Sequence, residues 1–233
     1  MNADEVMQLI NAPAGFGGAI SLPTVQLMLE TGRIRQFSPK SFITRRGQSA
    51  PRFCVVLRGQ VRLTAFTEDG REMLTHIIRA GDCWGVHPCL GQFDETNDTI
   101  TEDDAEVLML TPETVGNLMW TRQDFQKALV VLLCRRLNLA VSLAEQFGSW
   151  SARERVAWRL LLLGNGVGGG GAADFIPEIA VSQETLASMV HLSRQRTNVI
   201  LKALEKDGII AQKYGRIEIL SMDALRAQTD RAR

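Results

Sequence analysis

The chain has 233 residues, of which 45% are hydrophobic and 22% charged, and its 26 basic side chains balance 26 acidic ones. This length supports one large or two modest domains with real cores, and the composition is typical of a globular protein. No apolar run approaches the roughly 20 residues of a membrane span, and Asp4 and Glu5 stand where a secretory signal is basic. We therefore expect a cytoplasmic protein without membrane contact, whose four cysteines are reduced thiols.

The first half of the chain, over about residues 20–120, is typical of short β-strands. A helix is expected first, within 22–31, ended by Gly32. The run 53–57 is then continuously apolar, and apolar residues alternate from Val61 to Ala65. Turn signals separate the runs at Gly59, Asp69–Gly70 and Gly81–Asp82. Many short strands divided by such turns predict an antiparallel barrel or roll.

A long helix is predicted next, over 124–149. Its apolar residues recur every three or four positions for about three heptads, which is typical of coiled-coil pairing. We call this set the apolar seam: Val130, Leu133, Leu137, Ala140, Ala144 and Phe147. A second stripe beside it, Leu129, Leu132, Leu139 and Leu143, could pack against the roll. The alternative is one helix buried on both sides within a single chain.

The strongest functional pattern lies at residues 182–219, after a further helix and a glycine-rich segment expected to be a flexible loop. Ser182 can cap a short helix, and Ser193 can cap a second one running to about residue 206. His191 stands in the turn between them, where its tolerance of positive φ suits a tight connection. A hairpin with its tip at Tyr214–Gly215 follows, so the segment is predicted to be a winged helix-turn-helix.

Charge gathers on this segment although the whole chain is neutral. Between residues 191 and 216 there are six Lys and Arg residues and two acidic ones. A basic helix and wing in a neutral chain are typical of a surface that neutralises nucleic-acid phosphates. The alternative is a solvated basic helix, or a winged helix used only for protein contacts.

Together these segments resemble the Crp/Fnr superfamily of transcription regulators over nearly the whole chain. The matching stretches are LRGQVRLTAFTEDGRE, the AGD turn, LSRQRTNVILKALEKDGII and YGRIEI. The resemblance implies an α+β fold: an N-terminal antiparallel β-roll (a cyclic-nucleotide-binding-like jelly roll), a long dimerisation helix and a C-terminal winged helix-turn-helix. The expected domains are a sensor roll with short N-terminal helices at 1–123, the dimerisation helix at 124–149 and the DNA-binding domain at 150–233.

The resemblance also implies which side chains meet DNA, on a recognition helix at about 193–206. Arg194 matches an Arg with which the family reads bases, but Gln195 replaces the usual Glu and Val199 replaces a second Arg. Arg suits guanine, Gln suits adenine and Val can touch only a thymine methyl, so we expect an operator unlike the common family sequence. The full expected set is Ser193, Arg194, Gln195, Arg196, Asn198, Val199, Lys202, Lys213 and Arg216, with Ser193 and Arg196 on phosphates.

The effector region departs from the family more strongly. Members that bind cyclic AMP carry a Glu after the glycine at Gly85 and an Arg at the position of Glu95; this chain has Val86 and Glu95 there. A carboxylate repels the cyclic phosphate that an arginine would bind, so cyclic AMP is not the expected effector. The effector pocket is expected at Trp84, Gly85, Val86, His87, Glu95 and Thr96.

Two other ligands stay open for this region. His87 falls where haem-dependent carbon monoxide sensors of the family place a His, although Gly85 replaces their Cys. Zinc would need Cys83, His87, Cys89 and a fourth ligand from elsewhere. Otherwise the two cysteines are small core residues in a strand or loop, and we assign no metal site.

The sequence thus predicts a homodimeric DNA-binding transcription regulator that recognises a palindromic operator, controlled by an effector other than cyclic AMP. RNA polymerase would be a further partner if the protein activates transcription. No enzyme is expected, because the three His residues lie in no catalytic motif. The alternative function is a small-molecule, haem or redox sensor that signals through protein contacts without specific DNA binding.

Overall fold

The computed structural model describes residues 1–12, 15, 19–48, 51–66, 72–91, 93–165 and 178–229; within these, the side chains of 66, 72–74, 142–149 and 165 are not described. The chain forms two compact units, and the boundary between them falls between Arg136 and Leu137, inside helix α5 (Gln123–Ser149). The predicted long helix is therefore confirmed. The glycine-rich segment expected to be a loop lies almost entirely outside the described residues, at 166–177.

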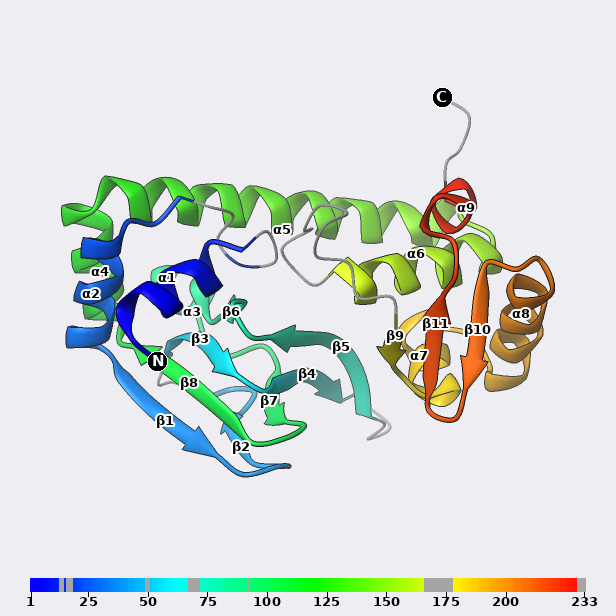
Figure 1. Ribbon diagram of the computed structural model, residues 1–233, viewed down its shortest axis with the longest axis horizontal. Coiled ribbons are helices and arrows are strands. Elements are labelled where there is room, and N and C mark those ends of the chain that lie inside the picture. Colours follow the sequence, from blue (N-terminus) through cyan, green and yellow to red (C-terminus); the bar gives the residue numbers. More distant parts are fainter. Residues whose placement is uncertain are drawn as a thin grey trace. The chain divides into compact units, whose positions relative to one another are not determined.

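Two antiparallel four-stranded sheets make up the roll of the first unit, within its described residues (Figure 1). One sheet has the order β1-β8-β3-β6 and the other β2-β7-β4-β5. The strands are β1 (Arg33–Phe37), β2 (Phe42–Thr44), β3 (Phe53–Arg58), β4 (Gln60–Phe66), β5 (Glu72–Arg79), β6 (Cys83–Trp84), β7 (Asp98–Thr101) and β8 (Ala105–Leu110). Strands β4 and β5 pair up to Phe66 and Glu72, as a hairpin requires, while its predicted tip at Asp69–Gly70 lies outside the described residues.

Strand β3 is apolar from Phe53 to Leu57 because both of its faces are covered over this length. Phe53, Val55 and Leu57 belong to the core between their sheet and the helices, whereas Cys54 and Val56 belong to the core between the two sheets. A strand buried on both faces loses the usual alternation of apolar and polar residues. Gly59 then turns the chain at φ +84 into the second sheet.

Short helices cover the first sheet. They are α1 (Ala3–Ile10), α2 (Leu22–Thr31), α3 (Val86–Gly91) and α4 (Pro112–Thr121). Helix α2 ends at Gly32 as predicted. Helix α3 was not predicted, and the expected strand or loop is wrong from Val86 onward. Helix α4 was also missed, although Thr111 caps it and Pro112 opens it, a pairing that marks a helix start.

The second unit contains α6 (Ala152–Asn165), α7 (Gln183–Met189), α8 (Arg194–Lys206) and α9 (Met222–Ala227). Its three-stranded antiparallel sheet has the order β10-β11-β9, built from β9 (Glu178–Ala180), β10 (Ile210–Lys213) and β11 (Arg216–Ile219). Strands β10 and β11 pair from Lys213 and Arg216 onward, which leaves Tyr214–Gly215 as a two-residue turn. The winged helix-turn-helix is confirmed.

Across the described residues, no helix combines the length and the apolar character needed to span a bilayer.

Candidate functional site

Helix α8 is held firmly at its start and along one face. The Ser193 hydroxyl accepts a hydrogen bond from the Arg196 amide at 3.2 Å and caps the helix, as Ser182 caps α7. His191 adopts φ 53 in the turn between them, so its expected left-handed conformation is confirmed. Thr197, Leu201 and Leu204 are buried completely, whereas Ile200, which the helical spacing would place beside them, is only half-buried.

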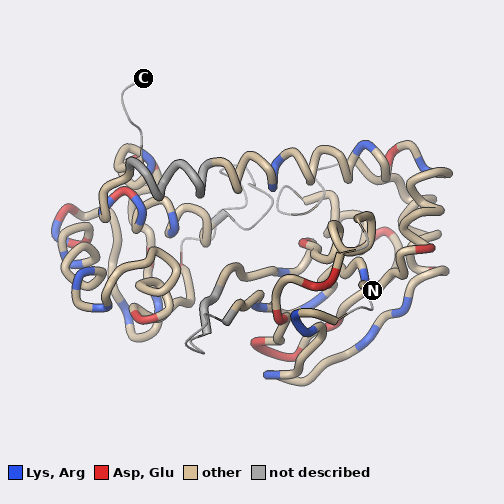
Figure 2. Tube along the Cα trace, turned by 180° about the vertical axis from the view of Figure 1, so that it is seen from behind, with Lys and Arg blue, Asp and Glu red and all other residues tan. Residues whose placement is uncertain are grey.

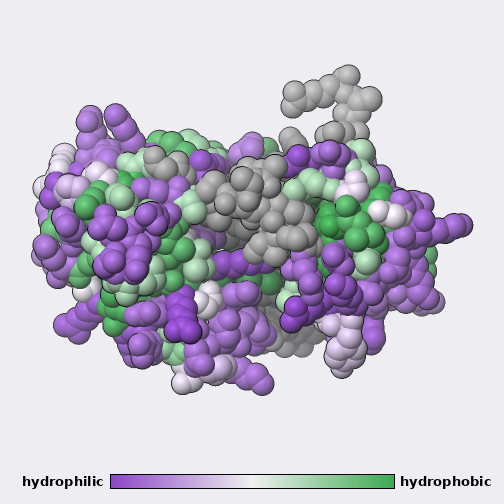
Figure 3. All heavy atoms as spheres, in the orientation of Figure 1, coloured by the Kyte–Doolittle hydropathy of each residue, from purple (hydrophilic) through white to green (hydrophobic). Residues whose placement is uncertain are grey.

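The opposite face of α8 is polar and open. Arg194, Gln195, Arg196 and Lys202 are exposed, and Val199 is 64% exposed although it is apolar. Within the described part of the chain, no carboxylate lies within ion-pair distance of these three cations. Figure 2 shows the Lys and Arg positions that gather on α8, and the visible surface over this helix in Figure 3 is mainly hydrophilic.

Asn198 differs from its neighbours on α8, because its side chain is half-buried. Its amide oxygen accepts a weak hydrogen bond, at 3.4 Å, from the amide of Gln183 on the first turn of α7. Gln183 also donates to the Gln212 side chain on β10 at 3.0 Å, and Gln212 donates to Glu205 at 2.9 Å. This network of side chains ties α7, α8 and the wing together, so that Asn198 has a fixed orientation.

The wing carries cations that are already paired. Arg216 lies 3.0 Å from Glu178 of β9, and Lys213 lies 2.9 Å from Glu218 and 3.8 Å from Glu178. The hydrogen bond from Lys213 to Glu218, together with the charge of Glu178, raises the pKa of Lys213. Two carboxylates therefore compensate the positive charge expected on the wing. Both lie outside residues 191–216: Glu178 precedes this range and Glu218 follows it.

A groove of about 460 Å³ runs between the wing and the starts of α7 and α8. Its polar lining includes Gln183, Arg194, Lys213 and Arg216, together with Tyr214, which is fully exposed at the wing tip. The groove brings together one base-reading candidate from α8 and both cationic candidates from the wing. The other predicted side chains, including Gln195 and Arg196, lie on the exposed turns of α8 beside it.

Comparison with known families matches both units. A cyclic nucleotide-binding domain model matches residues 34–122, and a Crp-like helix-turn-helix domain model matches residues 154–228. The chain belongs to the Crp/Fnr family. It is a DNA-binding transcription regulator of that type and not an enzyme.

Several Crp/Fnr proteins are similar over most of the chain. The cAMP-activated global transcriptional regulator CRP of Escherichia coli O6:H1 is 23% identical over 81% of this chain and 90% of its own length. The regulator Cmr of Mycobacterium tuberculosis is 26% identical over 92% of this chain and 84% of its own. FixK2 from Bradyrhizobium japonicum has a similar fold, with a TM-score of 0.70 at 18% identity over 87% of this chain and 99% of that structure.

The c-di-GMP responsive regulator CLP of Xanthomonas campestris also shares the Crp/Fnr fold, with a TM-score of 0.68 at 19% identity over 87% of this chain and all of that structure. Of these four regulators, CRP is named for cAMP and CLP for c-di-GMP, and the names of Cmr and FixK2 state no effector. Membership of the family therefore identifies the kind of protein without identifying an effector for this chain.

The six residues of the expected effector pocket have unequal exposure. Trp84 and Val86 are buried at 3% and 1% exposure and Glu95 at 5%, whereas His87 and Thr96 are exposed. Gly85 adopts φ +80, and a Cβ added there would lie 1.9 Å from the Arg52 carbonyl oxygen, so the position accepts only glycine. The Trp84 indole nitrogen and one Glu95 carboxylate oxygen have no hydrogen-bond partner among the described residues.

The cysteines of this region are core residues. Cys83 and Cys89 belong to the core between sheet and helices, and Cys54 lies in the core between the sheets. Burial raises the pKa of both Cys83 and Cys89 to about 12, and burial together with the Glu95 charge raises that of Cys54 well above its usual value. No group of three metal-binding side chains occurs among the described residues.

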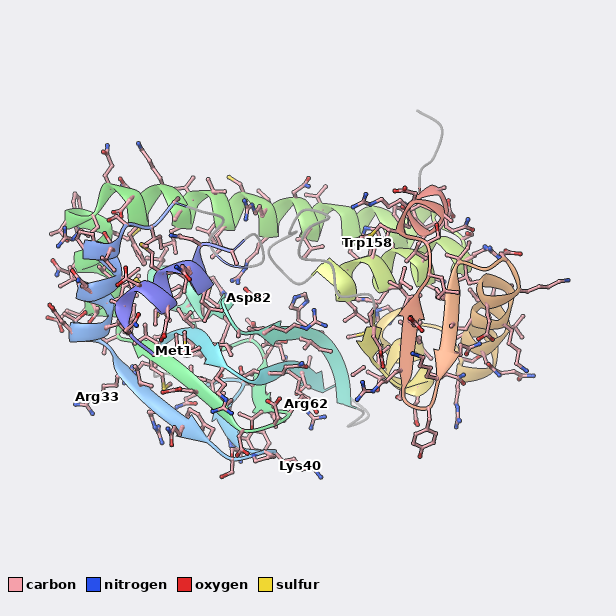
Figure 4. The ribbon with its side chains drawn as sticks, in the orientation of Figure 1. Met1, Arg33, Lys40, Arg62, Asp82 and Trp158 are labelled. Carbon is pink, nitrogen blue, oxygen red and sulfur yellow. The ribbon has the colours of Figure 1, made fainter. Side chains whose placement is uncertain are left out.

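One contact in this region could not be read from the sequence. The guanidinium of Arg136, on α5, donates to the Cys83 carbonyl oxygen and lies 3.7 Å from the buried carboxylate of Asp82. Asp82 marks the turn between β5 and β6, beneath α5 (Figure 4). Partial burial and the Arg136 charge both lower the pKa of His87 and so favour its neutral imidazole.

Proposed function

We propose that the chain acts as a homodimer that binds a palindromic DNA operator through the first two turns of α8. The observation that carries this proposal is the exposed set Arg194, Gln195 and Val199 on a helix whose other face is buried and whose start is capped. A side chain can read a base edge only if it reaches the major groove from a fixed helix.

The chemistry of these side chains suggests what is read. Arg194 binds guanine through two hydrogen bonds, Gln195 binds adenine in the same way, and Val199 contacts a thymine methyl. Ser193, Arg196, Asn198 and Lys202 bind phosphates and fix the register. Lys213 and Arg216 add backbone contacts from the wing.

Helix α5 is the proposed dimer contact. Val130, Leu133 and Leu137 of the apolar seam are 52%, 37% and 65% exposed. Leu129 and Leu132 of the second stripe are buried in the core of the first unit, which leaves the seam free for a second copy. Ala140 is exposed, and the side chains of Ala144 and Phe147 lie outside the described residues. The dimer axis would place two α8 helices in successive major grooves.

An effector other than cyclic AMP is proposed to control binding from the roll. The support is the pair of departures at Val86 and Glu95: one removes an acceptor for the ribose hydroxyl, and the other places a carboxylate where the phosphate would lie. His87 stays a haem-ligand candidate, tested by the Soret band of protein purified from haem-supplied cells. A DNA-binding regulator would work in the cytoplasm, with RNA polymerase as partner if it activates transcription.

The decisive experiment selects bound sequences from random DNA and repeats the selection with variants. Arg194→Ala is expected to lose discrimination at one base pair, a change of about 10- to 100-fold in preference. Arg196→Ala is expected to weaken binding to all sequences equally and to reduce the salt slope by about one. Arg226→Ala, on α9, removes an exposed cation outside this surface and is the matched control.

Two results would contradict the proposal. If Arg194→Ala kept the operator preference of the unaltered protein, α8 would not read bases through this residue. If the unaltered protein showed neither sequence preference nor a salt slope, specific DNA binding would fail, and a sensor that signals through protein contacts would be the better description.

A further inference from the structure

The wing presents its two cations in a different electrostatic state from those of α8. Glu178 and Glu218 lie directly opposite each other on β9 and β11. Two like charges in such a cross-strand pair repel each other. Lys213, which contacts both carboxylates, and Arg216, which contacts Glu178, offset that repulsion. The wing is therefore a cluster of two cations and two anions, close to neutral.

The α8 cations have no such partners among the described residues, yet both sets belong to one surface. Arg194 lines the same groove as Lys213 and Arg216. All four charged side chains of the wing cluster are 35–60% exposed, so solvent and phosphate can reach them. Pairs of this exposure are weak and are readily exchanged for another anion.

We propose that Glu178 and Glu218 compete with DNA phosphate for Lys213 and Arg216, and so limit the affinity of the wing for DNA. The inference rests on the proposed DNA binding through α8. When DNA binds, each wing cation exchanges a carboxylate for a phosphate oxygen. Because every DNA sequence has the same phosphates, the free-energy cost of this exchange is the same on every sequence. The two carboxylates thus set the strength of binding and its salt range, while Arg194, Gln195 and Val199 set the sequence preference.

The first test replaces Glu178 by its isosteric amide. Glu178→Gln frees Arg216 and weakens the hold on Lys213, so affinity should rise about two- to fivefold. The rise should be equal for a selected operator and for a random duplex, as measured by fluorescence anisotropy across a salt series. Glu218→Gln should act in the same direction through Lys213. The control Asp223→Asn removes a paired carboxylate on α9 that does not contact the wing, and should change neither affinity.

A double-variant cycle separates this competition from a simple loss of negative charge. In an Arg216→Ala, Lys213→Ala background, Glu178→Gln should give no gain, because the cations for which it competes are absent. A gain that persists in that background would overturn the proposal, and so would an unchanged affinity of Glu178→Gln in the otherwise unaltered chain. Thermal unfolding of each variant checks that the wing remains folded.

The salt slope gives an independent reading. Arg216→Ala should reduce the slope by about 0.9 if Arg216 moves to a phosphate. An unchanged salt slope would mean that Arg216 stays paired with Glu178 when DNA binds. The proposed exchange of carboxylate for phosphate would then be wrong, while base recognition by α8 would be unaffected. If the unaltered protein itself shows no salt slope and no sequence preference, the proposed DNA binding fails, and the two failures are thereby distinguished.

Discussion

Asp124 joins the start of α5 to the start of α2 through a single carboxylate. It accepts hydrogen bonds from the Ser21 amide at 2.8 Å, the Ser21 hydroxyl at 2.6 Å and the Thr24 hydroxyl at 2.8 Å. Partial burial raises the pKa of Asp124, but these hydrogen bonds outweigh that effect and lower it to about 2. Ser21 and Thr24 are about a hundred residues from Asp124 in the sequence, so no local pattern could predict the contact.

The lowered pKa makes the first unit sensitive to acid. A carboxylate whose folded pKa lies below its unfolded value of 3.8 stabilises the fold above that pH, and the stabilisation is lost as the pH falls towards about 2. The thermal stability of Asp124→Asn should therefore fall less than that of the unaltered protein between about pH 4 and pH 2. At pH 7 the substitution should destabilise the protein by about 1–3 kcal/mol, because it removes the charged acceptor of these hydrogen bonds. Thermal unfolding from pH 2 to 7 measures both effects, with exposed Asp94→Asn as control. If Asp124→Asn lost as much thermal stability at low pH as the unaltered protein, Asp124 would not have the lowered pKa.

The four thiols should differ sharply in reactivity. Cys54, Cys83 and Cys89 are buried with raised pKa values, whereas Cys134 is exposed on α5. Because the thiolate is the reactive form, at most one thiol per chain should react quickly with a disulfide reagent at pH 7. The other three should react at least about a hundredfold more slowly, through unfolding. Rapid labelling that survives in Cys134→Ser would contradict this expectation and would reopen a redox role for the roll.

At the scale of elements, helices and strands are predicted most reliably where the apolar residues follow a single period, helical or alternating, over a long stretch. Leu129 and Leu132 recur at helical spacing and are buried as expected, and the exposed Val130 and Leu133 lie on the neighbouring stripe. Both helices of the helix-turn-helix were predictable for a related reason. Ser182 and Ser193 cap them, and His191 accepts the left-handed turn between them.

Short elements and long-range contacts were not predictable in the same way. Helix α3 spans only six residues in a segment rich in strand-forming and turn-forming types, so its period cannot be recognised. The ion pairs of Glu178 depend on the pairing of β9 with β11, and the bond from Arg136 to Cys83 depends on how α5 packs against the roll. The charge window at 191–216 therefore overestimated the positive charge of the wing.

On the scale of the whole molecule, recognition of a palindrome requires two copies. Leu137 is 65% exposed, more than Val130 or Leu133 of the apolar seam. In a dimer formed along this seam, Leu137 of each copy would be buried against the other, and burial of a leucine side chain contributes about 1.5–3 kcal/mol. The seam should therefore decide both the mass of the protein in solution and its affinity for a two-fold symmetric operator.

Leu137→Glu tests this directly. Two carboxylates placed in the seam should raise the dimer dissociation constant at least about a hundredfold, because charges cannot be buried there unpaired. Analytical ultracentrifugation should show monomers at micromolar concentration, and operator binding should weaken while thermal stability changes little. Asn138→Glu, one position further along the exposed surface of α5, is the control. A dimer that survives Leu137→Glu would place the contact elsewhere.

The burial of Val86 limits which side chains this position can hold. Glutamate, which the resemblance implies at this position for members that bind cyclic AMP, would put a carboxylate among Cys83, Cys89 and their neighbours in a core where Val86 is only 1% exposed. Glu95→Arg would likewise add a long cation without a phosphate to receive it. Val86→Glu and Glu95→Arg, introduced one at a time to build a cyclic AMP site, are each expected to destabilise the protein before the other could add to binding.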